Sequence, residues 1–188
     1  LRDERRDEAP SPVWTAAWKE GSNGYRLWML SACDAVVAAN GPGQRSLEEA
    51  GRRVRYLDAV REGENLESDF VAVHEPSNTD GTWAVRSIER FQVPLSAGPE
   101  AVALRLDTEW GTYFVLFDFA GEAQVEGLSF EGRVGVVKAF NGATEWVWGC
   151  GATTLKEGST GYSGSPSHWR SEVASQVEGS IVPKEPPP

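Results

Sequence analysis

The chain has 188 residues and a formal net charge of −10, with 40% hydrophobic and 24% charged residues. This balance is typical of a globular domain rather than a disordered chain. The negative charge disfavours nucleic acid as a partner, and no apolar run approaches the length of a transmembrane helix, so we expect no contact with a membrane. Eight Trp and 20 Gly beside one Met favour β structure with many turns.

The first part of the chain predicts a leader followed by short strands. Residues 1–12 are charged and end in proline, and we expect this leader to be frayed. Apolar or alternating segments then predict strands over 13–18, 25–32, 35–39, 53–61 and 69–74.

The second part predicts a run of hairpins. Its strand segments are 83–93, 101–107, 112–119, 125–130, 133–140 and 144–149. Segments 101–107 and 112–119 predict a hairpin around Glu109-Trp110-Gly111. Gly121, Gly132 and Asn141-Gly142 are the predicted turns of a following three-stranded meander.

We therefore expect an all-β fold, an antiparallel β-sandwich of about ten short strands with a flexible C-terminal tail. The predicted organisation is a charged leader over 1–12, a sandwich domain over 13–157 and a tail over 158–188. Glycine, serine and proline dominate the start of that tail, which is typical of a linker or mobile loop.

Few residues suggest catalysis, and none suggests a cofactor. Cys33 and Cys150 could form one disulfide, stay as two free thiols or lie buried as small hydrophobic residues, and we favour no disulfide because a core of this size does not need one. The absence of C-x-x-C spacing disfavours a zinc site. His74, next to Glu75 at a strand end, is expected to be a hydrogen-bonded structural residue, and His168 lies in the predicted tail. No phosphate-binding glycine motif follows a strand.

Tryptophans are the more informative residues. Trp146 and Trp148 are two positions apart on one strand and therefore share a face. Trp110 lies at a predicted turn tip and Trp83 at a strand start. Sugar rings stack on exposed aromatic faces, so these four residues are candidates for carbohydrate binding. The alternative is that Trp146 and Trp148 fill the core between the sheets.

Two arginines complete the candidate site. Arg53 and Arg55 share one side of an alternating strand, where they could pair with the carboxylates of uronic acids. The alternative is that both side chains are simply solvated.

Several segments resemble, in order, strands of a known family. They are Tyr25–Leu30, Gly63–Pro76 with its Val-His-Glu-Pro ending, Ala84–Phe91, Glu100–Leu106 and Thr112–Phe117. Together they resemble the β-sandwich that follows the (α/α) toroid in heparinase II/III-like polysaccharide lyases. The resemblance covers roughly residues 13–155, which is the later β portion of such an enzyme rather than the whole.

This resemblance implies an accessory β domain of a lyase that cleaves uronic-acid polysaccharides by β-elimination, either supporting the catalytic toroid or holding the glycan. It implies a secreted or periplasmic location. No catalytic residue is carried over to this chain, because the toroid is not found here. Two other classes stay open, a free-standing carbohydrate-binding module and a non-enzymatic structural or interaction domain.

Overall fold

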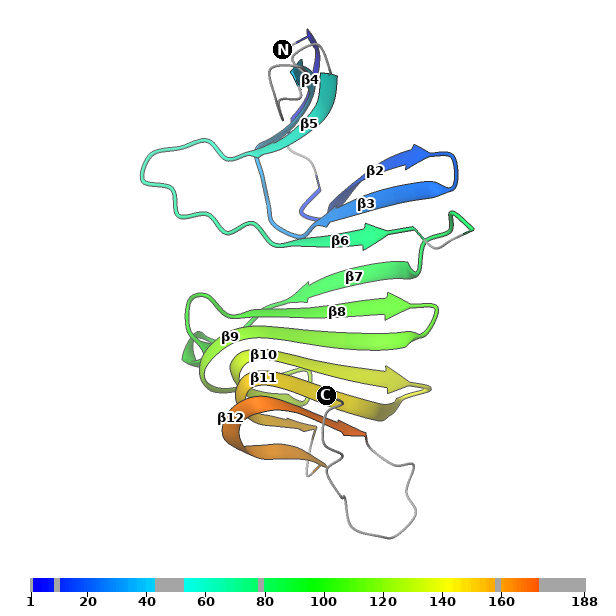
Figure 1. Ribbon diagram of the computed structural model, residues 1–188. Helices are drawn as coiled ribbons and strands as arrows, with labels where there is room; N and C mark the ends of the chain where they lie inside the picture. Colours follow the sequence, from blue (N-terminus) through cyan, green and yellow to red (C-terminus); the bar gives the residue numbers. More distant parts are fainter. Residues whose placement is uncertain (1, 9–10, 43–52, 78–79, 158–159, 173–188) are drawn as a thin grey trace. The chain divides into compact units, whose positions relative to one another are not determined.

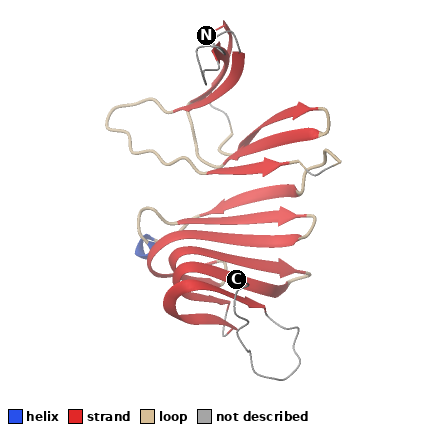
Figure 2. Ribbon diagram, in the orientation of Figure 1, coloured by secondary structure: helices blue, strands red, loops and turns tan. Residues whose placement is uncertain are grey.

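The structure is a computed structural model that describes residues 2–8, 11–42, 53–77, 80–157 and 160–172. Twelve β-strands and one short 3-10 helix make up the regular structure of these residues (Figure 2). All strand pairs are antiparallel, so the predicted all-β fold class is confirmed. The chain divides into two compact units, residues 1–82 and 83–188.

Unit 1 contains two three-stranded sheets. The first has the order β1 (Arg2–Glu8), β4 (Ala35–Pro42), β5 (Arg53–Val60). Its central strand β4 is an apolar run with buried Ala35, Val36 and Val37, so side chains on both of its faces are covered. The expectation of a frayed leader is wrong for Arg2–Glu8, because main-chain pairing with β4 orders a segment whose side chains carry no β pattern.

The second sheet of unit 1 has the order β2 (Trp14–Glu20), β3 (Asn23–Met29), β6 (Ala72–Pro76). On one of its faces, Glu75 is only 5% exposed. The Glu75 Oε2 accepts hydrogen bonds from Arg26 Nε at 2.8 Å and from Trp28 Nε1 at 3.0 Å. The Arg26 guanidinium also lies 4.4 Å from the centre of the Trp28 ring. A buried carboxylate is thereby paired and hydrogen-bonded, as burial requires.

Unit 2 is a single six-stranded meander in which each strand pairs with its neighbour along the chain (Figure 1). Its strands are β7 (Val85–Phe91), β8 (Val102–Thr108), β9 (Gly111–Val125), β10 (Leu128–Phe140), β11 (Ala143–Glu157) and β12 (Thr160–Glu172). A 3-10 turn, η2 (Leu95–Ala97), connects β7 to β8. The predicted hairpin is confirmed, with β8 and β9 in register from Val102 opposite Phe117 to Thr108 opposite Gly111.

Long strands of this sheet bend sharply, and the sheet thereby folds over itself. Figure 2 shows the ribbons curving round at one end. The bends coincide with Asp118 at φ 50°, Gly132 at φ 142° and Gly151 at φ 59°, and the strand registers shift beside them. Positive φ and bulges are common devices for bending strands. The result is a sandwich-like arrangement in which one set of strands runs through both layers.

The core of unit 2 lies between these layers. Phe130 is fully buried and meets the Phe119 ring edge-on, with the two centroids 5.1 Å apart. A Cβ atom at Gly135 would come within 2.6 Å of the Phe130 ring, so only glycine leaves room there. The buried cluster comprises Ala97, Ala101, Ala103, Leu116, Phe119, Ala123, Val125, Leu128, Phe130, Val137, Val147, Ala152 and Leu155.

Of the three predicted turns, two are wrong and one is confirmed. Gly121 and Gly132 do not separate strands but lie inside β9 and β10. The turn that joins these strands is Glu126-Gly127, both at positive φ, near the start of the predicted strand 125–130. Asn141-Gly142 does form the β10–β11 turn, with φ values of 52° and 77° that fit a type I′ hairpin.

The predicted linker is also corrected in part. Thr160–Glu172 forms β12, which pairs with β11, because main-chain hydrogen bonds to an existing edge do not require an apolar pattern. Residues 158–159 and 173–188 of the predicted tail lie outside the described residues. No disulfide joins Cys33 and Cys150. None of the described segments forms a helix with the length and apolar character needed to cross a bilayer.

Candidate functional site

One face of the unit 2 sheet carries apolar and aromatic side chains although it lies opposite the core. Side chains alternate along a strand, so the residues next to core-facing Leu116, Val137 and Val147 point to the other side. The registers align them in three rows across β8 to β11. We call this set the apolar sheet face: Leu106, Tyr113, Lys138 and Trp146; Leu104, Val115, Val136 and Trp148; Val102, Phe117, Val134 and Cys150.

The apolar sheet face is partly open. Leu104 is buried and Phe117 is 37% exposed, while the other ten side chains of the face are half-buried. Trp146 and Trp148 both lie here and are absent from the buried cluster of the core. Both indole rings therefore keep part of their surface available on the same side of β11.

Polar groups border the two tryptophans at the first row. The Trp146 ring meets Tyr113 edge-on, with centroids 6.1 Å apart. The Lys138 ammonium lies 5.9 Å from the Tyr113 ring centre and 2.7 Å from Glu145 Oε2. The hydrogen bond to Glu145 raises the pKa of Lys138 further above neutrality, so this ammonium is charged at physiological pH. The Lys138 ammonium and the Glu145 carboxylate thus lie at strand positions next to three aromatic residues, Tyr113, Trp146 and Trp148.

Trp110 lies near the same end of the sheet, at the tip of the β8–β9 hairpin. Its side chain is 53% exposed. Thr108 holds the turn, since its Oγ1 donates to the Gly111 carbonyl at 2.8 Å and accepts from the Trp110 amide at 3.0 Å. A Cβ at Gly111 would come within 2.5 Å of the Ala139 carbonyl oxygen, so the hairpin tip lies tightly against β10.

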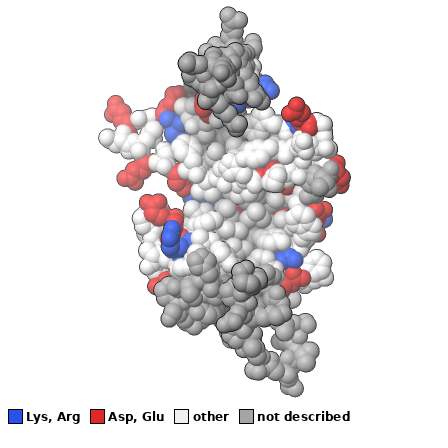
Figure 3. Space-filling view, in the orientation of Figure 1, with Lys and Arg blue, Asp and Glu red and all other residues white. Residues whose placement is uncertain are grey.

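The remaining predicted site residues lie elsewhere. Trp83 is half-buried and precedes β7 at the start of unit 2. Arg55 is exposed on β5 of unit 1, and the side chain of Arg53 lies outside the described residues. The apolar sheet face therefore contains Trp146 and Trp148 but neither arginine. Figure 3 shows Lys and Arg as scattered side chains on the face in view, without a broad basic patch.

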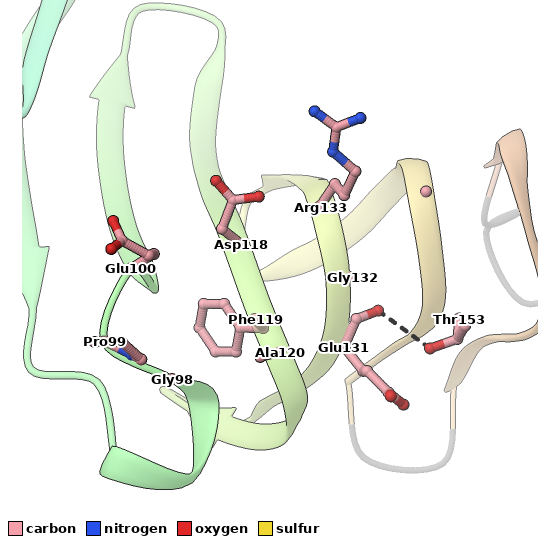
Figure 4. Close-up of a pocket in the computed structure, with 11 residues that line it drawn as sticks. Gly98, Pro99, Glu100, Asp118, Phe119, Ala120, Glu131, Gly132, Arg133 and Thr153 are labelled. Carbon is pink, nitrogen blue, oxygen red and sulfur yellow. Dashed lines mark hydrogen bonds between the residues drawn. The ribbon is translucent and has the colours of Figure 1, made fainter.

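The structure also contains a pocket at the bend of unit 2, which the sequence did not predict (Figure 4). Its volume is about 540 Å³, and Phe119 and Gly132 contribute to its lining. Its charged residues are Glu100, Asp118, Glu131 and Arg133.

The charged groups of this pocket do not converge. Figure 4 shows the Arg133 and Glu131 side chains extending in opposite directions, on either side of the bend at Gly132. The drawn hydrogen bond joins Thr153 Oγ1 to the Glu131 carbonyl at 3.4 Å. Among the described residues, no three His, Cys, Asp or Glu side chains are placed to hold a metal ion. The pocket is therefore a weaker candidate than the apolar sheet face.

Sequence reasoning found Trp146 and Trp148 from their spacing but missed Tyr113 and Lys138. The register that aligns Lys138 with both Tyr113 and Trp146 is what assembles the row. The predicted turn at Asn141-Gly142 could have supplied the register between Lys138 and Trp146, because a two-residue loop fixes which residues oppose one another.

No family model, curated protein or solved structure matches the chain.

Proposed function

We propose that this chain is an accessory β domain that binds polysaccharide on the apolar sheet face. The observation that carries the proposal is the row of Tyr113, Lys138 and Trp146 beside Trp148, partly open to solvent. Aromatic rings accept the C–H faces of sugars, and nearby charged groups bind hydroxyls and carboxylates. The Lys138 ammonium fits the carboxylate of a uronic acid, and Glu145 fits a sugar hydroxyl.

We further propose that the domain belongs to a heparinase II/III-like polysaccharide lyase, secreted or periplasmic, that acts on uronic-acid glycans. The support is the order of the resembling segments, which fall on β3, β6, β7, β8 and β9. In this proposal β-elimination belongs to a catalytic toroid, and the present chain contributes binding.

A glycan array of neutral and uronic-acid polysaccharides tests the proposal, followed by calorimetric titration of the best ligand. We expect binding to uronic-acid glycans and no rise in absorbance from unsaturated uronates. Trp148→Ala should weaken binding about tenfold, which corresponds to about 1.4 kcal/mol. Lys138→Gln should weaken binding to acidic glycans only.

The matched control is Leu95→Ala, which removes an apolar side chain that is almost fully exposed on η2. We expect this variant to bind like the parent chain. Equal affinity of the parent chain and Trp148→Ala would place the glycan elsewhere and contradict the proposal. Product formation would show that the chain has a complete active site.

A second function is favoured by the size of the apolar sheet face. Its second and third rows are mostly aliphatic and extend beyond what a sugar needs, which suits contact with another protein domain such as the toroid. In that case the folded chain should bind an apolar dye such as anilinonaphthalene sulfonate. Phe117→Ser should reduce dye binding, and the glycan array should stay negative.

A further inference from the structure

We propose that unit 1 carries its own carbohydrate site, which binds uncharged oligosaccharides on an aromatic strip formed by Trp18, Tyr25 and His74. The strip lies on the β2-β3-β6 sheet, on the face opposite the buried Glu75. This inference goes beyond the proposed function, since it concerns a different unit, different residues and a different class of sugar.

The three rings lie side by side across three strands. Trp18 and Tyr25 are cross-strand partners, and their ring centroids are 5.9 Å apart with planes at 47°. The Tyr25 and His74 centroids are 5.6 Å apart with planes at 48°. Tyr25 is 39% exposed and His74 is also exposed. Trp18 is half-buried, so the row offers two exposed rings and one partly open ring on which neighbouring sugars of one chain can stack.

A side-chain hydrogen bond orders the strip before any ligand arrives. The Tyr25 Oη and the His74 Nδ1 are hydrogen-bonded to each other. The other ring nitrogen of His74, Nε2, lies on the far side of the ring. A sugar hydroxyl can hydrogen-bond to it in either tautomer, because a hydroxyl both donates and accepts. Fixing both rings beforehand lowers the entropy lost on binding.

The polar rim of the strip specifies an uncharged ligand. Glu20 and Asn23 are paired across the β2–β3 hairpin, two positions beyond the Trp18–Tyr25 pair, and so lie on the same face. Both are exposed. A carboxylate and an amide can together accept from and donate to hydroxyls, whereas the carboxylate repels uronic acids and phosphates. The face carries no Lys or Arg among its residues on β2, β3 and β6 to offset that charge.

The strip can be altered without removing the contacts that hold the sheet. The Arg26–Glu75–Trp28 hydrogen bonds lie on the opposite face. Ser77 also fixes the sheet end, because its Oγ accepts from the Gly24 amide at 2.8 Å. Substitutions at Trp18 or Tyr25 therefore leave these contacts in place.

Calorimetric titration of the full chain with cellohexaose, mannohexaose and laminarihexaose, beside tetragalacturonate, tests the inference. We expect at least one neutral hexaose to bind, and Trp18→Ala to weaken it about tenfold. Tyr25→Phe keeps the ring but loses the bond to His74, so we expect a several-fold loss. Phe70→Ala, at an exposed aromatic residue of unit 1 that lies outside the strip, is the matched control and should leave the neutral affinity unchanged.

Separate outcomes identify which proposal fails. If no neutral hexaose binds, or if Trp18→Ala and the parent chain bind it equally, the strip is not a sugar site. Binding of acidic glycans that depends on Trp148 would then leave the proposed function intact. Neutral binding that depends on Trp18 alone, with no acidic binding, would support the strip and overturn the role of the apolar sheet face. Amide NMR spectra of each variant confirm that loss of binding does not reflect unfolding.

Discussion

The two units bury their strands by different means. Unit 2 has strands of 13 and 15 residues, long enough to bend and cover one another, and its described residues include a cluster of thirteen buried apolar side chains. In unit 1 the strands have five to eight residues, and one of its sheets buries a charged residue, Glu75, against Arg26 and Trp28. The long strands of unit 2 thus let one meander enclose an apolar core, whereas the β2-β3-β6 sheet of unit 1 also buries a hydrogen-bonded charge.

The largest expected effect tests the apolar core of unit 2. Phe130→Ala should lower the free energy of unfolding by about 3–5 kcal/mol, because it removes a fully buried ring and leaves a cavity. Denaturant unfolding followed by tryptophan fluorescence measures it. Phe140→Ala, at an exposed phenylalanine of the same strand, should change stability by less than about 0.5 kcal/mol. Similar losses in both variants would mean that the core does not dominate unit 2.

The next effect tests the polar cluster of unit 1. Glu75→Ala should cost about 2–3 kcal/mol, since it leaves the half-buried Arg26 and the Trp28 indole without their shared acceptor. Hydrogen exchange should accelerate at β3 and β6 amides and stay unchanged at β10 amides. Glu64→Ala, at an exposed glutamate, should have no such effect. Equal acceleration in both units would remove the distinction between them.

A smaller effect concerns a polar contact at the surface of unit 2. Burial raises the pKa of Asp107, but hydrogen bonds from Thr112 and Ser87 and the nearby Arg105 outweigh it and lower the pKa overall. Folding therefore favours the ionised form of Asp107. The resulting stabilisation is fully present above the pKa of this group in the unfolded chain, about 4, and is lost as the pH falls through its lower pKa in the folded chain.

Asp107→Asn should therefore cost about 1 kcal/mol at pH 7 and progressively less below pH 4. Unfolding curves from pH 7 to pH 2.5 measure this difference. Glu100→Gln, at an exposed carboxylate of the same unit, serves as the control. A difference that does not change with pH would exclude the carboxylate as its source.

The smallest expected effect is on stability at the hairpin tip. Trp110→Ala should shift the free energy of unfolding by less than about 0.5 kcal/mol, because the indole is largely exposed and the turn is held by Thr108. Thermal unfolding measures it. A loss above 1 kcal/mol would show that Trp110 is a structural residue of unit 2 rather than a surface available for binding.

Local signals in the sequence predicted much of this fold. The β8–β9 hairpin and the Asn141-Gly142 turn follow from alternation and turn chemistry, both of which act between neighbours in the chain. The bends were not predictable in the same way. A glycine inside a β pattern fits either a turn or a bulge, and at Gly132 the close approach of Gly151 and Ala152 on the neighbouring strand accompanies a bulge.

The candidate sites, like the fold, were predictable only where neighbouring residues in the chain determine them. Trp146 and Trp148 share a face by parity alone, so the sequence was sufficient for them. The Tyr25–His74 pair was missed because 49 residues separate its members, and only the pairing of β3 with β6 brings them together. The strands β1 and β12 were missed for a related reason, since their pairing uses main-chain groups that every sequence provides.

The neighbour-to-neighbour order of β7 to β12 has a consequence for how fast unit 2 forms. Each strand pairs with the one made just before it, so every pair of hydrogen-bonded strands is joined by a short connection in the chain. Chains with such local contacts fold faster than sandwiches whose partners are distant in sequence. We expect unit 2 to fold by successive addition of hairpins during synthesis, with β12 as the last strand to join.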